Sequence, residues 1–352
     1  MIQGRECKHY QRELRKRRKQ LQQYKKIRRR KRQIRLKLRP YYLRIRKWES
    51  RQEDNALYPP TDFRYLQNFE ECNRFFYKLI NAKPSIQLGS KQPYIKIDCS
   101  NVEKIDFTTT CIWAAISEVL KEKPLSYGIY GVLPAKAECR AFIKQSGFLD
   151  GKVDEYGRQF PIAKGASKMI IQKGEDRFKD EHVRYFVDSV AEVYKKLNIV
   201  TPPAYMVTVI KEICGNSVEW SEAHYKRWTL SRLETPDYYE FVALDLGKGI
   251  LKSLHLGYQG IIRSMGLSSE KDILLRAFEK KYSSESKEKN RHKGLPLVRK
   301  AFLDGKFKGL YVACNNVLLD FENSENTCQI PEKKRQQCPG TIYRWIINKE
   351  CK

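Results

Sequence analysis

Two short polar phrases constrain this chain more than any other feature of its sequence. The first holds Glu212 and Asn216 in a proline-free stretch from Ala204 to Trp220. Apolar residues recur there at helical spacing, namely Val207, Ile210, Ile213 and Cys214. The spacing predicts a helix with Glu212 one turn before Asn216 on a single face.

The second phrase, Asp245-Leu-Gly247-Lys-Gly249, follows an apolar run at 241–244 that predicts a buried strand. A carboxylate at a strand end can accept a hydrogen bond from a ligand amine. Glycines allow the backbone to turn tightly and to approach that ligand closely. The alternative for both phrases is ordinary packing, an amphipathic helix followed by a strand and a turn.

The two phrases resemble the N box (Glu-x-x-x-Asn) and the first glycine box (Asp-x-Gly-x-Gly) of the GHKL or Bergerat ATPases. Two later phrases extend the resemblance. Gly294-Leu295-x-Leu297 is similar to the end of the second glycine box, and Gly340-Thr341 to the terminal Gly-Thr of the family. His292 and Lys293 stand where the family has glycines, which puts the phosphate cradle in doubt.

The resemblance implies a Bergerat-type α/β sandwich with a mixed sheet over 176–352, with ATP and Mg²⁺ as cofactors. Asn216 would offer an oxygen to Mg²⁺, and Glu212 would orient or deprotonate the attacking water or hydroxyl. Asp245 would accept from the adenine amino group. The other implied nucleotide-binding residues are Gly247, Gly249, Lys293, Gly294, Leu295 and Thr341.

Three functions remain open at this level. The leading hypothesis is an ATP-driven regulatory switch, in which lid closure changes contacts with a protein or nucleic-acid partner. The second is a Ser/Thr protein kinase of the anti-sigma factor type. The presence of Glu212 favours the hydrolysing and Ser/Thr-phosphorylating branches over the histidine kinases. The third is a nucleic-acid-binding protein with a vestigial ATP site.

Residues 58–150 predict a separate α/β unit, because strands and helices alternate along them. The pattern predicts a helix at 63–81, a strand at 94–98, a helix at 111–120, a strand at 125–132 and a helix at 136–145. Residues 151–175 then predict a linker with a lone strand.

This unit resembles a STAS domain through Asp98, Ile105-Asp106 and Gly147-Phe148. It departs from that family at Phe107-Thr108-Thr109, where the family has Ser-Ser-Gly. Thr108 takes the place of the serine that antagonists have phosphorylated, which makes it a candidate phosphoacceptor. The alternative is that Thr108 is an ordinary helix N-cap. STAS domains mostly bind partners, so the resemblance implies a protein partner.

The basic arm, residues 1–57, carries most of the net charge of +28. Residues 1–48 hold 21 Lys and Arg against two acids, with tyrosines and Trp48 interleaved. Such a disordered or helical arm is typical of nucleic-acid binding through phosphate contacts and base stacking. A solvated tail, an acidic partner protein and an anionic membrane surface are the alternatives. The densest cationic positions are Arg15, Lys16, Arg17, Arg18, Arg28, Arg29, Arg30 and Arg32.

Nothing in the sequence predicts a membrane span or a secretory signal core, because no apolar run is long enough. The ten cysteines are scattered without a Cys-x-x-Cys pair, which favours reduced thiols and a cytoplasmic protein. The sequence leaves a homodimer open.

Overall fold

The computed structural model describes residues 22, 56–84, 94–122, 128–154, 158–161, 170–174, 180–200, 204–219, 228–254, 269–279, 294–331 and 337–352. Two compact units divide the chain. The first, Met1–Asn55 with Pro84–Tyr94, falls almost entirely outside the described residues. The second, Ala56–Lys83 with Ile95–Lys352, holds the fold and the candidate site.

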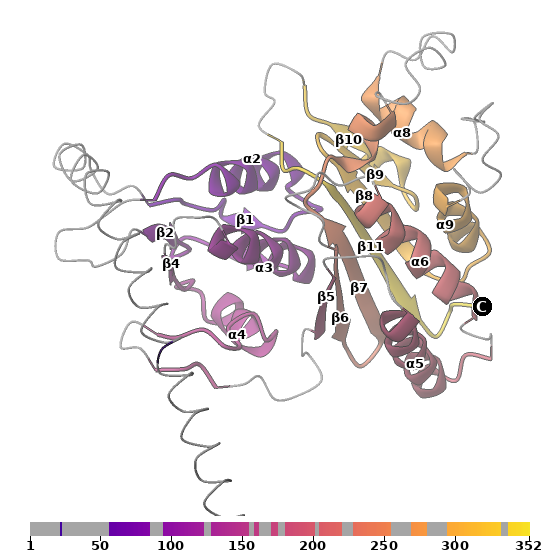
Figure 1. Ribbon diagram of the computed structural model, residues 1–352, viewed down its shortest axis with the longest axis horizontal. Helices are drawn as coiled ribbons and strands as arrows, with labels where there is room; N and C mark the ends of the chain where they lie inside the picture. The colour runs from indigo at the N-terminus through magenta and orange to yellow at the C-terminus, as the bar shows by residue number, and fades with distance from the viewer. Residues whose placement is uncertain are drawn as a thin grey trace, which may run out of the picture. The chain divides into compact units, whose positions relative to one another are not determined.

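A seven-stranded sheet forms the centre of the second unit, in the order β10-β9-β8-β11-β7-β6-β5 (Figure 1). Every pairing within it is antiparallel. Its strands are β5 (Ile170–Gly174), β6 (Trp228–Glu234), β7 (Tyr238–Asp245), β8 (Lys308–Cys314), β9 (Val317–Asp320), β10 (Cys328–Gln329) and β11 (Thr341–Asn348).

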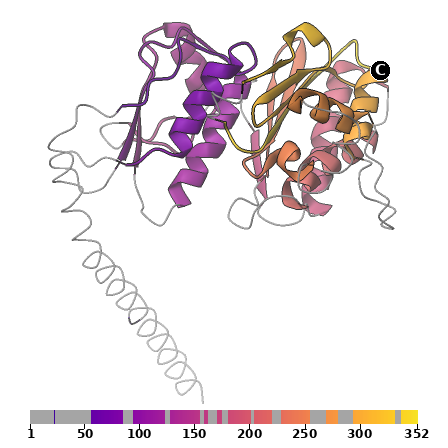
Figure 2. The ribbon, with the colours of Figure 1, turned by 90° about the horizontal axis from the view of Figure 1, so that it is seen from above.

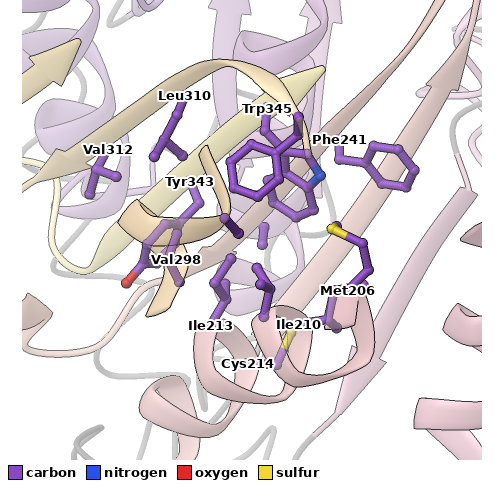
Figure 3. Packing of buried hydrophobic residues seen from close by; sticks show 14 of the residues in the cluster. Met206, Ile210, Ile213, Cys214, Phe241, Val298, Leu310, Val312, Tyr343 and Trp345 are labelled. Atoms are coloured by element: carbon purple, nitrogen blue, oxygen red, sulfur yellow. The ribbon is translucent and has the colours of Figure 1, made fainter. Parts of the chain in front are cut away.

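Four helices cover one face of this sheet: α5 (Asp180–Leu197), α6 (Ala204–Glu219), α8 (Glu270–Phe278) and α9 (Gly294–Leu303). Their apolar side chains share one core with β7, β8 and β11. Figure 3 shows Met206, Ile210 and Ile213 of α6 against Tyr343 and Trp345 of β11. Phe241 stacks on Trp345 with ring centroids 5.3 Å apart. Helix α6 is therefore anchored by apolar burial, with Glu212 left only partly buried at its edge.

The opposite face of the sheet packs against α2 (Phe69–Ile80) and α3 (Phe107–Glu122). Figure 2 gives a second view of the helices on the two sides of the sheet. Short strands lie beyond them: β1 (Asp62–Phe63) pairs in parallel with β3 (Lys104–Ile105), and β2 (Tyr94–Asp98) pairs with β4 (Gly128–Val132). Helix α4 (Ala137–Gln145) adds Ile143 to the same core.

Alternation along β7 and β11 decides which side chains meet which helices, since successive side chains of a strand point to opposite faces. Phe241 and Ala243 of β7 belong to the core on the α6 side, whereas Val242 and Leu244 belong to the core on the α3 side. The same periodicity assigns Asp245 to the α6 face.

The α/β class predicted from the sequence is confirmed. Strand β2 has the predicted bounds, and β7 contains the apolar run 241–244 that predicted a buried strand. The expected helix at 63–81 begins only at Phe69, because Asp62 and Phe63 pair with β3. Helix α9 begins at Gly294, and Pro296 fits its first turn. On α6, Met206 and Val209 are buried and Val207 is half-buried, which shifts the predicted apolar face.

The boundaries at 57, 150 and 175 remain predictions, and so does the likeness of 58–150 to a STAS domain. The described parts of 58–150 and of 176–352 lie in one compact unit with a shared core. All eight arginines and lysines singled out in the basic arm lie outside the described residues. No helix within the described ranges combines the length and the apolarity of a membrane span.

Candidate functional site

The predicted aspartate lies at the C-terminal end of β7, with 6% of its surface exposed. Its Oδ1 accepts a hydrogen bond of 2.8 Å from the backbone N–H of Gly247. This bond closes the turn after the strand and fixes the carboxylate. A helical segment described over 249–254 begins directly after that turn.

Two glycines bring three chain segments together at this turn. Gly249 has a φ of +77°, and a Cβ on it would lie 2.7 Å from both Asn315 Oδ1 and the Gly340 carbonyl oxygen. Gly340 has a φ of +98°, and a Cβ on it would lie 2.7 Å from the Asp245 carbonyl carbon. Both positions need the left-handed backbone and the missing side chain. The sequence predicted a tight turn at Gly249, and Gly340 shows the same combination of positive φ and close backbone approach.

Thr341 pairs directly with Asp245 across β11 and β7, and only 3% of it is exposed. Its Oγ1 accepts from the N–H of Ile250 at 3.3 Å, and Cys314 Sγ accepts from the N–H of Leu251 at 3.4 Å. These side chains therefore satisfy the first backbone donors of the helical segment 249–254, which have no partner within a helix. The structure thus brings Asp245, Gly247, Gly249 and Thr341 into one site.

Glu212 and Gly294 form the second part of the candidate site, where α6 meets the start of α9. Gly294 is buried, and a Cβ on it would lie 3.0 Å from Glu212 Cδ, with Oε2 nearer still. The glycine therefore lets α9 begin against the Glu212 side chain. Leu295, the next predicted residue, is half-buried and packs on the core beneath α9.

Two predicted residues cannot be placed in this way. Asn216 belongs to α6, one turn after Glu212 as expected, but its side chain is outside the described residues. Lys293 also lies outside them. Within the described ranges, no group of three His, Cys, Asp or Glu side chains could hold a metal ion. The assignment of Mg²⁺ to Asn216 therefore stays a prediction.

Tyr343 is a site residue that sequence reasoning missed. It is two positions after Thr341 on β11, so it lies on the same face of the sheet as Asp245, the face that α6 covers. Its side chain is buried, and its hydroxyl has no hydrogen-bond partner among the described residues (Figure 3). Burial raises the pKa of this phenol well above its usual range, and the charges of Asp245 and Glu212 contribute to the rise. An uncharged hydroxyl thus lies within electrostatic reach of both predicted acids.

Thiols also line the site. Burial raises the pKa of the Cys314 thiol to about 12, and the charge of Asp245 raises it further against opposing hydrogen bonds. Burial likewise raises the pKa of Cys338 to about 12, and Asp245 again contributes. Both side chains are therefore neutral near pH 7.

Thr108 lies away from this site, on the α3 face of the sheet. It is 1% exposed, and its hydroxyl lies 3.5 Å from Glu240 Oε1, to which it donates. The alternative role as N-cap is wrong, because Asp106 Oδ1 accepts the 2.7 Å hydrogen bond from the N–H of Thr109. Phosphorylation of Thr108 stays a prediction, and it would require α3 to leave the sheet.

The missed residues differ in whether the sequence could have revealed them. Tyr343 follows from strand alternation once Thr341 is placed. Asn315 sits with a φ of 54° between two strands, and asparagine is favoured at such left-handed turn positions. Cys314 has no comparable signal, because its role depends on two turns meeting in space.

Comparison with protein-family models finds no match, and comparison with curated proteins finds none either. Among solved structures, the chain is similar to the mycobacterial sensor histidine kinase MprB. The identity is 15%, the TM-score is 0.25, and the likeness covers 47% of this chain and 94% of that chain. A likeness at this level carries no argument about function, which has to come from the site itself.

Proposed function

We propose that this protein is an ATP-binding regulatory switch whose nucleotide site lies between the β7 turn and helix α6. One observation carries the proposal. Three distant parts of the sequence, represented by Gly249, Asn315 and Gly340, meet at the end of the central strands β7 and β11. Asp245 and Thr341 lie there on the face covered by α6. A fixed buried acid beside bare backbone turns suits recognition of a flat base that carries an amino group.

The residues present fit such a ligand chemically. Asp245 would accept from the adenine amino group, which guanine lacks at that position. Gly249 and Gly340 carry no side chain of their own, which lets the three segments approach one another closely. When bound, Mg²⁺-ATP would supply a transferable phosphoryl group. Glu212, at the junction of α6 and α9, would take the proton of an attacking water or hydroxyl.

The test is calorimetric titration with Mg²⁺ and a non-hydrolysable ATP analogue. We expect Asp245→Asn to weaken binding about tenfold or more, because an amide offers a donor where the adenine amino group also donates. Wild-type protein should prefer the adenine analogue over the guanine analogue.

Asp320→Asn is the matched control. Asp320 is also buried, at 5% exposure, and ends β9 of the same sheet. Its Oδ1 accepts from the N–H groups of Glu322 and Asn323 at 2.9 and 3.0 Å. This variant should lose stability and keep its nucleotide affinity. Equal binding by wild type and Asp245→Asn, or no binding by wild type, would refute the proposed function.

A further inference from the structure

Asn73 is a buried amide in the middle of α2 that bridges two distant segments of the chain. It has 0% exposure. Its Nδ2 donates to the backbone carbonyl of Asn315 at 2.7 Å, and its Oδ1 accepts from the backbone N–H of Cys338 at 2.6 Å. One side chain thus uses both ends of its amide on partners more than two hundred residues away in sequence.

Both partners lead directly into the candidate nucleotide site. Asn315 donates from its own Nδ2 to the carbonyl of Lys248 at 3.4 Å, and its Oδ1 limits the space at Gly249. Cys338 stands two residues before Gly340, whose backbone presses on that of Asp245. Asn73 therefore holds the turn between β8 and β9 on one side and the approach to β11 on the other.

An amide at this position is not needed to fill the core. The other buried side chains of α2 are Phe69, Cys72, Phe75, Phe76 and Leu79, and a leucine at position 73 would continue that apolar face. Burying an amide is unfavourable unless its groups are hydrogen-bonded. The two short hydrogen bonds offset that cost only while both turns keep their present positions. The arrangement thus makes the conformation of the turns and the packing of α2 depend on each other.

We propose that Asn73 is a positioning residue that couples helix α2 to the nucleotide site. The coupling to ligand rests on the proposed function, whereas the positioning of the turns does not. Because coupling between two sites is reciprocal, occupancy of the site should also stabilise α2. Nucleotide binding would therefore change the stability of α2, on the face of the sheet opposite α6.

Amide hydrogen exchange of the full chain tests both halves of this proposal. Without ligand, Asn73→Leu should speed exchange about tenfold at Cys338 and over 248–251, because each lost buried hydrogen bond favours local opening. Asn73→Asp keeps the acceptor for Cys338 and loses the donor to Asn315. It should therefore loosen 248–251 and leave the Cys338 amide protected. Asn315→Gly, which suits the left-handed backbone, should loosen 248–251 alone.

Thr110→Val is the control, because Thr110 is fully buried on α3 and its hydroxyl donates to the local carbonyl of Phe107. It should change neither turn. With the ATP analogue present at saturation, wild type should gain protection over α2, and Asn73→Leu should bind without that gain.

The outcomes separate the two proposals. Unchanged exchange in both turns of Asn73→Leu, or changes equal to those of Thr110→Val, would overturn the positioning role whether or not nucleotide binds. If Asn73→Leu loosens the two turns selectively but the wild type binds no nucleotide, the positioning role is supported and the proposed function is refuted. If ATP protects α2 equally in wild type and Asn73→Leu, the coupling to α2 is refuted while nucleotide binding stands.

Discussion

The two faces of strands β7 and β11 carry acids in contrasting surroundings. On the α6 face, Asp245 is held by the N–H of Gly247 beside two glycine turns. On the α3 face, Glu240 accepts from Arg344 Nε at 3.0 Å, and the hydroxyl of Thr108 lies close to the same oxygen. Arg344 also donates to the carbonyl of Gly309 at 3.1 Å.

This difference separates the candidate site around Asp245 from a structural contact made by Glu240, Arg344 and Thr108, which we call the seam. The Glu240–Arg344 pair is an ion pair between strands of one sheet, and its side chains are 10% and 15% exposed. Its hydrogen bonds are made to other residues of the fold, namely Thr108 and Gly309. The Asp245 turn instead brings the backbone of Gly249 and Gly340 and the side chain of Asn315 together at the end of β7. The first arrangement helps to fix how α3 meets the sheet, and the second is the place where we propose that a nucleotide binds.

The largest effect is expected from a methyl group at the turn. Gly340→Ala should destabilise the protein by more than about 3 kcal/mol, because it adds left-handed strain and a clash with the Asp245 backbone. Chemical denaturation measures the loss. Gly151→Ala is the control, since Gly151 has a φ of +72° but nothing within 4 Å of its Cβ position. It should cost about 1 kcal/mol from strain alone. Equal losses in the two variants would show that close approach at Gly340 is unimportant.

The next effect is expected at the seam. Arg344→Met should cost about 3 kcal/mol of unfolding free energy, because it leaves Glu240 buried without its cation. Nucleotide affinity should stay within about twofold, the reverse of the pattern for Asp245→Asn.

Arg64→Met supplies the exposed comparison for that variant. Arg64 pairs with Asp62 at 2.6 Å, but both side chains are about one-third exposed, at 34% and 32%. Its loss should cost less than about 1 kcal/mol. If Arg344→Met instead weakened ATP binding and spared stability, the seam would belong to the functional site.

A smaller, pH-dependent effect is expected at Asp106, which faces the seam. Burial raises the pKa of this carboxyl from 3.8 to about 6; the charge of Glu240 contributes, while Thr109 and Arg344 oppose the rise. The folded state therefore binds the proton more tightly than the unfolded chain. Stability should be greatest below about pH 4 for this group and fall as pH rises through about 6.

Asp106→Asn keeps an acceptor for the Thr109 N–H and removes the charge. It should stabilise the protein by about 2 kcal/mol at pH 8 and by little at pH 4, measured by denaturation at both values. Asp98→Asn should behave in the opposite sense, because a backbone hydrogen bond from Ser100 lowers the pKa of Asp98. If the unfolding free energies of wild type and Asp106→Asn rise in parallel between pH 4 and pH 6, the raised pKa of Asp106 is contradicted.

Local pattern explains why much of this fold could be predicted. Apolar periodicity predicted α6, and the apolar run 241–244 predicted β7. The turn residues Asp245, Gly247 and Gly249 were recognisable because a buried strand ended beside them. Their meeting with Thr341 was inferred from a family resemblance, whereas its cause is the β7–β11 register, which pairs Thr341 with Asp245.

The packing of α3 shows what local sequence pattern does not predict. Residues 58–150 read as a separate unit because strands and helices alternate there. Yet Phe63, Ile112 and Ile116 share a core with Val242 and Ile342 of the large sheet. The hydrophobic effect is not directional, so an apolar helix face predicts burial but does not specify which sheet will cover it. Thr108 illustrates the same limit, because its buried position next to Glu240 follows from that packing.

Local sequence accounts for the elements and for the chemistry at their ends. Examples are the helix that carries Glu212 and Asn216, and the strand that ends at Asp245 with glycines after it. Short-range spacing and backbone preference suffice for those features. Only the packing of distant segments explains that Gly294 begins α9 against Glu212, that the buried Tyr343 hydroxyl has no hydrogen-bond partner among the described residues, and that Asn73 ties α2 to both turns. Each of these contacts joins residues far apart along the chain, and only the packing of the two cores brings them within reach.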